Sequence, residues 1–154
     1  MAFSSFWFGS SGVVNPISLS ATASVGDVGG SNVGRINDGD LTTLFTTAST
    51  PTDGQALAKL DFGSSQTIAG FKAYLTQQGA GDAVTMRLEH SDNDSSWTTF
   101  GTAWTISPGN SGHTETQTPT AVSKRYWRLT ANQNYDATAS CSELALYATT
   151  GQMP

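Results

Sequence analysis

The sequence predicts an all-β domain, built as a sandwich or barrel of short strands, and its composition is the first reason. Of 154 residues, 19 are Ser, 22 are Thr and 16 are Gly, whereas Glu and Lys each occur only three times. Strong helix formers are scarce, which excludes a helical bundle. Aromatic residues make up 10% of the chain, which excludes a disordered Ser/Thr-rich stalk. A chain of this length can bury a core without a metal or a disulfide.

The second reason is a regular succession of short apolar segments and turn signals. Apolar and polar residues alternate over 84–89, which is the pattern of a strand with one buried face. The turn over 90–96 predicts a hairpin, residues 63–65 end an earlier strand, and Gly70 indicates a bulge. About eight strands are predicted, at residues 58–62, 68–75, 84–89, 97–100, 103–107, 114–118, 125–131 and 142–148. Such spacing is typical of a sandwich or barrel.

The N-terminal segment differs from the rest of the chain. Four aromatic residues crowd into six positions, Phe3, Phe6, Trp7 and Phe8, and a Gly/Ser-rich hinge follows them. We expect residues 1–18 to form an extended arm, 19–150 the domain and 151–154 a short tail. The arm either folds back onto its own domain or docks into a partner protein, because an exposed aromatic cluster of this size is unusual on a monomer.

The net charge restricts the kinds of molecule that the chain can bind, and the cysteine content restricts the disulfides that it can form. The net charge of −5 argues against nucleic acid and anionic membrane surfaces, which favour clustered Lys and Arg. Cys141 is the single cysteine, so no intrachain disulfide can form. Residues 1–12 lack the features of a signal peptide, and no apolar run approaches the roughly 20 residues that span a bilayer. We therefore expect no membrane insertion.

Four short motifs occur in one order along the chain. They are RINDGDLTTLF at 35–45, LAKLDFG at 57–63, SDNDSSW at 91–97, and RYWRL at 125–129 with SELALY at 142–147. Together they resemble the discoidin domains, also called coagulation-factor type C or F5/8 type C domains, over roughly residues 19–148. The resemblance implies a galactose-binding-like jelly-roll β-sandwich with ligand-binding loops at one end. Many bacterial relatives are carbohydrate-binding modules.

The chain departs from that family's pattern at three points. Phe45 replaces the usual Trp, Asp94 replaces the hairpin Gly, and the terminal cysteine pair of animal members is missing. The last departure removes the extracellular disulfide and weakens an animal-secreted interpretation. Fold alone does not determine function, so the ligand must be argued from the site.

The loop Asp38-Gly39-Asp40 is the best candidate for a metal site. Calcium takes six to eight oxygen ligands from carboxylates, hydroxyls and carbonyls, and a Gly between two Asp allows a sharp turn. The resemblance implies that Glu143 on the last strand closes a structural Ca²⁺ site and that Thr43 contributes to it. The alternative is an ordinary Asp-Gly turn in which Asp38 caps the backbone.

Glu143 lies in an otherwise apolar strand. A buried ionised carboxylate is costly unless it meets a cation or several donors, which is consistent with a calcium ligand. Alternatively, Glu143 pairs with Arg35 or Arg128. A third possibility is that the alternation of side chains along the strand places it on the solvated face.

A sugar site requires an aromatic platform beside a few convergent polar groups. The candidates in loops are Arg35, Phe45, His113, Asn134 and Tyr135. His113 lies in a Gly/Ser/Thr-rich stretch where simple solvation is the alternative. Three tryptophans, Trp97, Trp104 and Trp127, lie within strand patterns and are expected in the core.

Signals for catalysis are poor. The sequence contains no nucleophile elbow, no zinc-protease helix motif and no glycine-rich phosphate loop. Asp92 and Asp94 have the composition of a glycosidase pair, but their place in a hairpin turn indicates solvent exposure. We expect a non-enzymatic protein.

These observations leave two principal functions. The first is a structural or decoration protein of a tailed bacteriophage, made in the host cytoplasm, with the discoidin-like domain displayed and the arm anchored in other virion proteins. The start MAFSSFWFGSSG resembles those of small phage structural proteins. Such a protein is expected to form a homo-oligomer in the particle and to bind a glycan. The alternative is a free-standing or secreted bacterial carbohydrate-binding module, located outside the cell.

Overall fold

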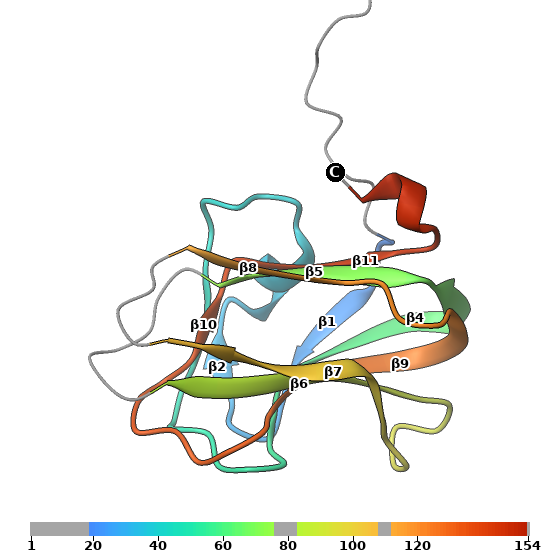
Figure 1. Ribbon diagram of the computed structural model, residues 1–154. Coiled ribbons are helices and arrows are strands. Elements are labelled where there is room, and N and C mark those ends of the chain that lie inside the picture. Colours follow the sequence, from blue (N-terminus) through green and yellow to red (C-terminus); the bar gives the residue numbers. More distant parts are fainter. Residues whose placement is uncertain (1–18, 76–82, 108–111, 154) are drawn as a thin grey trace, which may run out of the picture.

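Two β-sheets pack face to face in a computed structural model that describes residues 19–75, 83–107 and 112–153 (Figure 1). The larger sheet has the strand order β1 (Thr22–Val25), β4 (Ala56–Ile68), β9 (Val122–Ala131), β6 (Val84–Ser91) and β7 (Thr98–Ile106). The opposing sheet has the order β11 (Glu143–Tyr147), β5 (Gly70–Leu75) and β8 (His113–Gln117). A small third sheet consists of β10 (Ser140–Cys141), β3 (Phe45–Thr47) and β2 (Gly30–Ser31).

All strand pairs in these sheets are antiparallel, and the only helices in the described parts are short 3₁₀ turns, η1 (Val33–Asn37) and η2 (Thr150–Gln152). Neither turn has the length and apolarity of a membrane-spanning helix. The predicted all-β, jelly-roll sandwich is confirmed.

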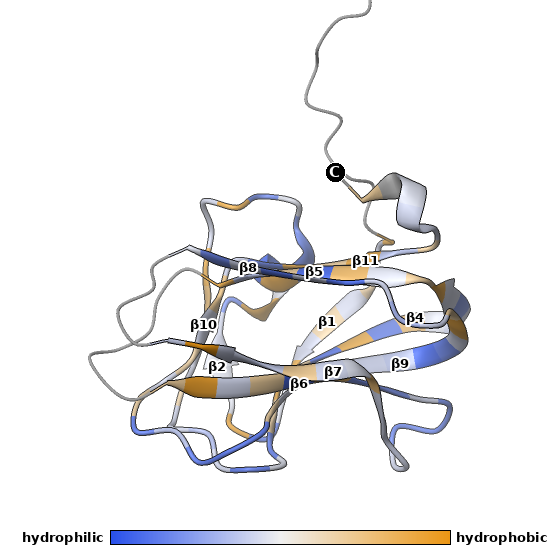
Figure 2. Ribbon diagram, in the orientation of Figure 1, coloured by the Kyte–Doolittle hydropathy of each residue, from blue (hydrophilic) through white to orange (hydrophobic). Residues whose placement is uncertain are grey.

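An aromatic layer joins the two sheets. The ring of Phe71 on β5 lies 5.4 Å from Trp104 and 6.2 Å from Phe100, both on β7. Phe100 in turn contacts Trp127 of β9 at 5.0 Å, edge to face. Figure 2 shows apolar residues concentrated along the strands and hydrophilic residues in the connecting loops. Trp104 and Trp127 therefore lie in the core, as predicted.

The strand boundaries differ from the prediction in two ways. The segments predicted at 97–100 and 103–107 form one strand, β7, with a register irregularity between its pairs to Met86 and Leu88. The strand predicted to end at residues 63–65 continues as β4 to Ile68, because Gly63 adopts a φ of 73° and forms a bulge between Asp61 and Gln66.

Gly70 does not form the predicted bulge. It begins β5 and pairs in register with Tyr147. A Cβ atom at this position would lie 2.6 Å from Sδ of Met153 and 3.0 Å from the carbonyl oxygen of Gln117. A side chain at this position would require Met153 to move and would crowd the backbone of β8.

A charged cluster lies where β6 and β9 pair in the larger sheet. Glu89 is only 5% exposed and accepts hydrogen bonds from Nε of Arg87 at 2.8 Å and Nε of Arg128 at 2.6 Å. The hydroxyl of Thr130 donates a third at 2.9 Å. Burial alone would raise the pKa of Glu89, but these hydrogen bonds outweigh it and hold the pKa below its usual range. The stability that ionised Glu89 contributes is thus lost as pH falls through this lowered pKa.

We predict that Glu89→Gln lowers the free energy of unfolding by about 2 kcal/mol at neutral pH, because two arginines lose a buried partner. The difference from the unmutated protein should disappear in acid, where Glu89 itself is protonated. Urea unfolding at neutral and acidic pH measures both effects. Asp92→Asn, which removes an exposed pair with Lys124, is the matched control and should cost less than about 1 kcal/mol. A loss independent of pH would contradict the prediction.

Candidate binding site

The loop over residues 38–43 is held by its own side chains. Asp38 Oδ1 accepts a hydrogen bond from the Asp40 amide at 2.9 Å, and Asp40 Oδ1 accepts from the amide and hydroxyl of Thr42 at 2.8 and 2.6 Å. The Thr43 hydroxyl donates to Asp38 Oδ2 at 2.9 Å. Gly39 adopts a φ of 78°, which lets the chain turn between the two acids. The loop thus has a defined shape.

Glu143 connects this loop to β11. Its Oε2 accepts a hydrogen bond from the Gly39 amide at 3.0 Å, although the two residues lie far apart in the sequence. Its side chain is not on a solvated face, because Glu143 is only 3% exposed. Neither of the two arginines considered as alternative partners pairs with Glu143. Arg35 donates to the Leu44 carbonyl at 3.4 Å, and Arg128 pairs with Glu89.

The second oxygen of Glu143, Oε1, is buried and has no hydrogen-bond partner among the described residues. Burial raises the pKa of this carboxyl to about 7; the Gly39 hydrogen bond opposes the shift and the negative charge of Asp38 adds to it. Because this pKa exceeds the ordinary value of 4.5, ionisation of Glu143 costs stability as pH rises towards 7. A cation beside Oε1 would offset that cost.

The atoms around Glu143 suit a hard cation. Asp38 and Thr43 carry carboxylate and hydroxyl oxygens, which are engaged with the Asp40 amide and with each other. The carboxylate of Asp40 is engaged by Thr42, and its carbonyl oxygen accepts from the Thr43 hydroxyl at 3.1 Å. In the described part of the chain, no group of three or more His, Cys, Asp or Glu side chains gathers as a metal centre. An ion here would therefore depend on hydroxyl and carbonyl oxygens, the ligands of calcium rather than of zinc.

A hollow of about 180 Å³ adjoins the loop, where β5 ends and β8 begins. We call it the loop-end hollow. Leu41, at the tip of the 38–43 loop, is 50% exposed at its rim. The complete lining is Leu41, Tyr74, Leu75, Gly112, His113, Thr114 and Ser142.

Two buried polar atoms of this lining have no hydrogen-bond partner among the described residues: the Ser142 hydroxyl and Nε2 of His113. The latter lies 3.5 Å from Oε2 of Glu115. Burial, and then the charge of Glu143, raises the pKa of Tyr74, so its phenol remains a proton donor. Unsatisfied polar atoms beside an aromatic ring are the components of a site for a hydroxyl-rich ligand.

The other predicted ligand residues lie elsewhere. Phe45 is 1% exposed and lies in the core, and Tyr135 is also buried, with its hydroxyl donating to the Thr85 carbonyl at 2.9 Å. Neither ring offers a face to a sugar, which corrects the expectation that they form a platform. The side chain of Asn134 accepts from the Asp53 amide at 3.0 Å, outside the hollow, and Arg35 does not line it either. Of the predicted set, only His113 lines the loop-end hollow.

The lining residues that sequence reasoning missed are chiefly Leu41, Tyr74 and Ser142. Each comes from a different segment, and none carries a motif for binding. The only available signals were the neighbouring Asp-Gly-Asp loop for Leu41 and the outward register of Tyr74 within its strand.

Each of the two acids of the hairpin pairs with a lysine of the larger sheet. Asp92 Oδ2 lies 2.5 Å from Lys124 Nζ, and Asp94 Oδ1 lies 3.0 Å from Lys59 Nζ. The hairpin also carries Trp97, which is half-buried rather than in the core as predicted, with the Arg128 guanidinium 4.3 Å from its ring.

A jelly-roll sandwich with a hollow beside a loop at the strand ends is the architecture of a carbohydrate-binding-module-like domain. The family model for the F5/8 type C domain matches residues 19–144, and the chain belongs to this family. No curated protein sequence matches the chain.

Solved structures agree with this assignment. The CBM32 of AlyQ, in complex with 4,5-unsaturated mannuronic acid, is 25% identical with a TM-score of 0.62, over 86% of this chain and 96% of that one. Chitosan-binding module 1 of a chitosanase/glucanase from Paenibacillus sp. IK-5 is 26% identical with a TM-score of 0.59, over 86% and 97%. CBM32-1 of a family 31 glycoside hydrolase from Clostridium perfringens, at 14% identity and a TM-score of 0.65 over 82% and 93%, shares the fold.

Proposed function

We propose that the chain is a non-catalytic carbohydrate-binding module that binds a saccharide in the loop-end hollow. The observation that carries the proposal is the hollow itself, in which the ring of Tyr74 lies beside the polar residues His113 and Ser142. In the proposed complex, polar groups of His113, Thr114 and Ser142 bind sugar hydroxyls, while Tyr74 and Leu41 contact the apolar C–H face of the ring.

Charge bears on the kind of saccharide. Three acidic side chains, Asp38, Glu115 and Glu143, lie close to the hollow, and the whole chain carries a net charge of −5. Without a bound cation these charges repel a uronate, and with Ca²⁺ on Asp38 and Glu143 the acid Glu115 and the net charge still disfavour one, so an uncharged or amino sugar is the better ligand. The two neighbours of highest identity among those described above are named with an acidic sugar and with chitosan, which supports the saccharide class without selecting one member.

We predict that the full chain binds uncharged or amino-sugar oligosaccharides on a glycan array, and that His113→Ala weakens the affinity by about tenfold, the loss of about 1.4 kcal/mol for one hydrogen bond. Isothermal titration with an array-selected oligosaccharide measures the change. Asn134→Ala, at the predicted ligand position that lies outside the hollow, is the control and should leave the affinity unchanged. An array without signal would refute the proposed function, and equal losses in the two variants would refute the site.

We further propose a structural Ca²⁺ ion held by Asp38, Thr43 and Glu143, with the Asp40 loop as its frame. The support is the unpaired Oε1 of Glu143, whose other oxygen accepts the Gly39 amide of the loop that carries Asp38 and Thr43. Such an ion would keep the 38–43 loop in place and with it Leu41, which lines the loop-end hollow.

Calcium at a hundredfold excess over its dissociation constant should stabilise the fold by about 2.7 kcal/mol, and a chelator should remove that gain. The melting temperature, measured with EGTA and with added CaCl₂, reports the effect. Glu143→Gln should abolish the response to Ca²⁺, whereas Glu115→Gln should retain it. A melting temperature indifferent to calcium in the unmutated chain would contradict the metal site.

The role in a bacteriophage virion stays a prediction. The four aromatic residues on which it rests, Phe3, Phe6, Trp7 and Phe8, lie outside the described residues, and the solved relatives described above are carbohydrate-binding modules. A free-standing module outside the cell accounts for the fold and the hollow equally well. The crowding of aromatic residues is the feature that favours attachment to a larger assembly, and with it the predicted homo-oligomer and virion location.

Deletion of residues 1–12 should prevent incorporation into phage particles while leaving the domain folded, because the arm and not the sandwich would make the anchoring contacts. Co-sedimentation with purified particles measures incorporation, and circular dichroism measures folding. The full chain is the control. Continued incorporation of the shortened chain would exclude anchoring through the arm.

A further inference from the structure

Positive charge is unevenly distributed over the sandwich. Five of the seven Lys and Arg residues lie on three neighbouring strands, β4, β9 and β6: Lys59, Arg87, Lys124, Arg125 and Arg128. Each lies within 3.0 Å of a carboxylate oxygen, so these charges are balanced locally. The net negative charge of the chain therefore comes from other parts of the molecule.

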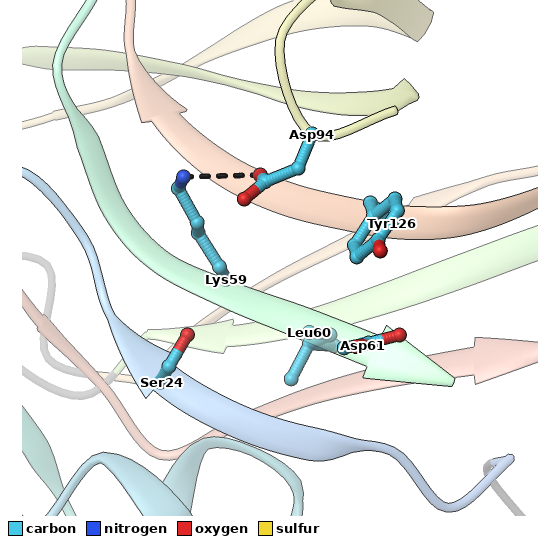
Figure 3. A pocket seen from close by; sticks show the side chains of 6 residues that line it. All are labelled: Ser24, Lys59, Leu60, Asp61, Asp94 and Tyr126. Atoms are coloured by element: carbon cyan, nitrogen blue, oxygen red, sulfur yellow. Dashed lines mark hydrogen bonds and ion pairs between the residues drawn. The ribbon is translucent and has the colours of Figure 1, made fainter. Parts of the chain in front are cut away.

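A second hollow, of about 130 Å³, lies on this sheet (Figure 3). We call it the sheet-face hollow. Lys59 of β4 and Asp94 of the hairpin point toward each other, with Nζ and Oδ1 3.0 Å apart, and the ring of Tyr126 stands beside them on β9. Its lining is Ser24, Lys59, Leu60, Asp61, Asp94 and Tyr126.

The ring of Tyr126 lines the hollow, and the ring of Trp97 lies near Lys59 outside the lining. The Arg125 guanidinium lies 4.6 Å from the Tyr126 ring and is itself held by Asp61 through two hydrogen bonds of 2.7 and 2.9 Å. The ring of half-buried Trp97 lies 5.7 Å from Lys59 Nζ. These cation–π contacts orient the rings before any ligand arrives.

Asp94 lines the hollow from the turn of the hairpin. Asp94 has a φ of 56°, in the left-handed region that glycine adopts without strain. Its carboxylate is 43% exposed, and an ion pair at that exposure adds little to the stability of the fold. Asp tolerates this conformation in a turn, and its partly exposed carboxylate is accessible to a ligand as well as to Lys59.

We propose that the sheet-face hollow is a second saccharide-binding site, which takes one uncharged pyranose unit. Lys59 and Asp94 bind its hydroxyls, and Tyr126 contacts its C–H face. An uncharged sugar is favoured because each cation of this surface is already paired with a carboxylate, and one unit because the volume lies below the ~300–1,000 Å³ of sites for larger ligands. The inference rests on the proposed function for the class of ligand only.

The two hollows lie on different sheets of the sandwich. The loop-end hollow is formed at β5 and β8, and the sheet-face hollow at β1, β4 and β9. One domain with both sites would bind a polysaccharide at two points, which raises the effective affinity when both engage.

The test is an NMR titration of the ¹⁵N-labelled full chain with methyl pyranosides of galactose, glucose, mannose and N-acetylglucosamine. We expect chemical-shift changes at Lys59, Asp94 and the Trp97 indole with at least one of these sugars. Asp94→Gly should weaken this binding by about tenfold, while its fold is retained because glycine suits the backbone at this position. Asp94→Asn keeps one acceptor oxygen and should lose less.

His113→Ala serves as the matched control and should leave the shifts on the sheet face unchanged. Shifts confined to Tyr74 and His113, or sheet-face binding that survives Asp94→Gly unchanged, would overturn the second site while the proposed function stands. Sheet-face shifts with D-glucuronate alone would likewise overturn it. Absence of shifts at either hollow with every sugar, together with a blank glycan array, would contradict both proposals.

Discussion

The contact between the two sheets, made by Phe71 of β5 against Phe100 and Trp104 of β7, is the constraint on which the rest of the structure depends. This contact buries the apolar face of each sheet. A strand has only two faces, and one of them must be buried for stability. Ligands are left with the strand ends and the outer faces. The loop-end hollow lies at strand ends, and the sheet-face hollow lies on an outer face.

Glu143 links the core to the loop-end hollow. The residue pairs with Tyr74 in the β11–β5 ladder, follows Ser142 in the chain and accepts the Gly39 amide of the 38–43 loop. This buried carboxylate therefore lies next to three parts of the hollow: Tyr74, Ser142 and the 38–43 loop. An unpaired buried oxygen costs stability, and compensation of that cost would stabilise the loop and the hollow together.

The two hollows differ in their electrostatic environments. Glu115 and Glu143 are acidic groups close to the loop-end hollow, and in the proposed site they would disfavour anionic sugars when they are ionised and no cation is bound. On the sheet face, by contrast, Lys59 is paired with Asp94 and Arg125 with Asp61, so the surface is close to neutral and provides donors and acceptors side by side. Hydroxyl groups, which both donate and accept hydrogen bonds, match such paired charges well.

By itself the sequence determined the all-β class and the hairpin over 90–96, because alternation and turn chemistry are local properties. The order of its motifs also pointed to the meeting of Glu143 with the 38–43 loop. Two-residue strands such as β2 and β10 carried no periodic signal. Only the tertiary structure decided that Phe45 and Tyr135 are buried and that the lining residues converge in two hollows, because burial and convergence follow from the pairing and packing of segments far apart in the chain.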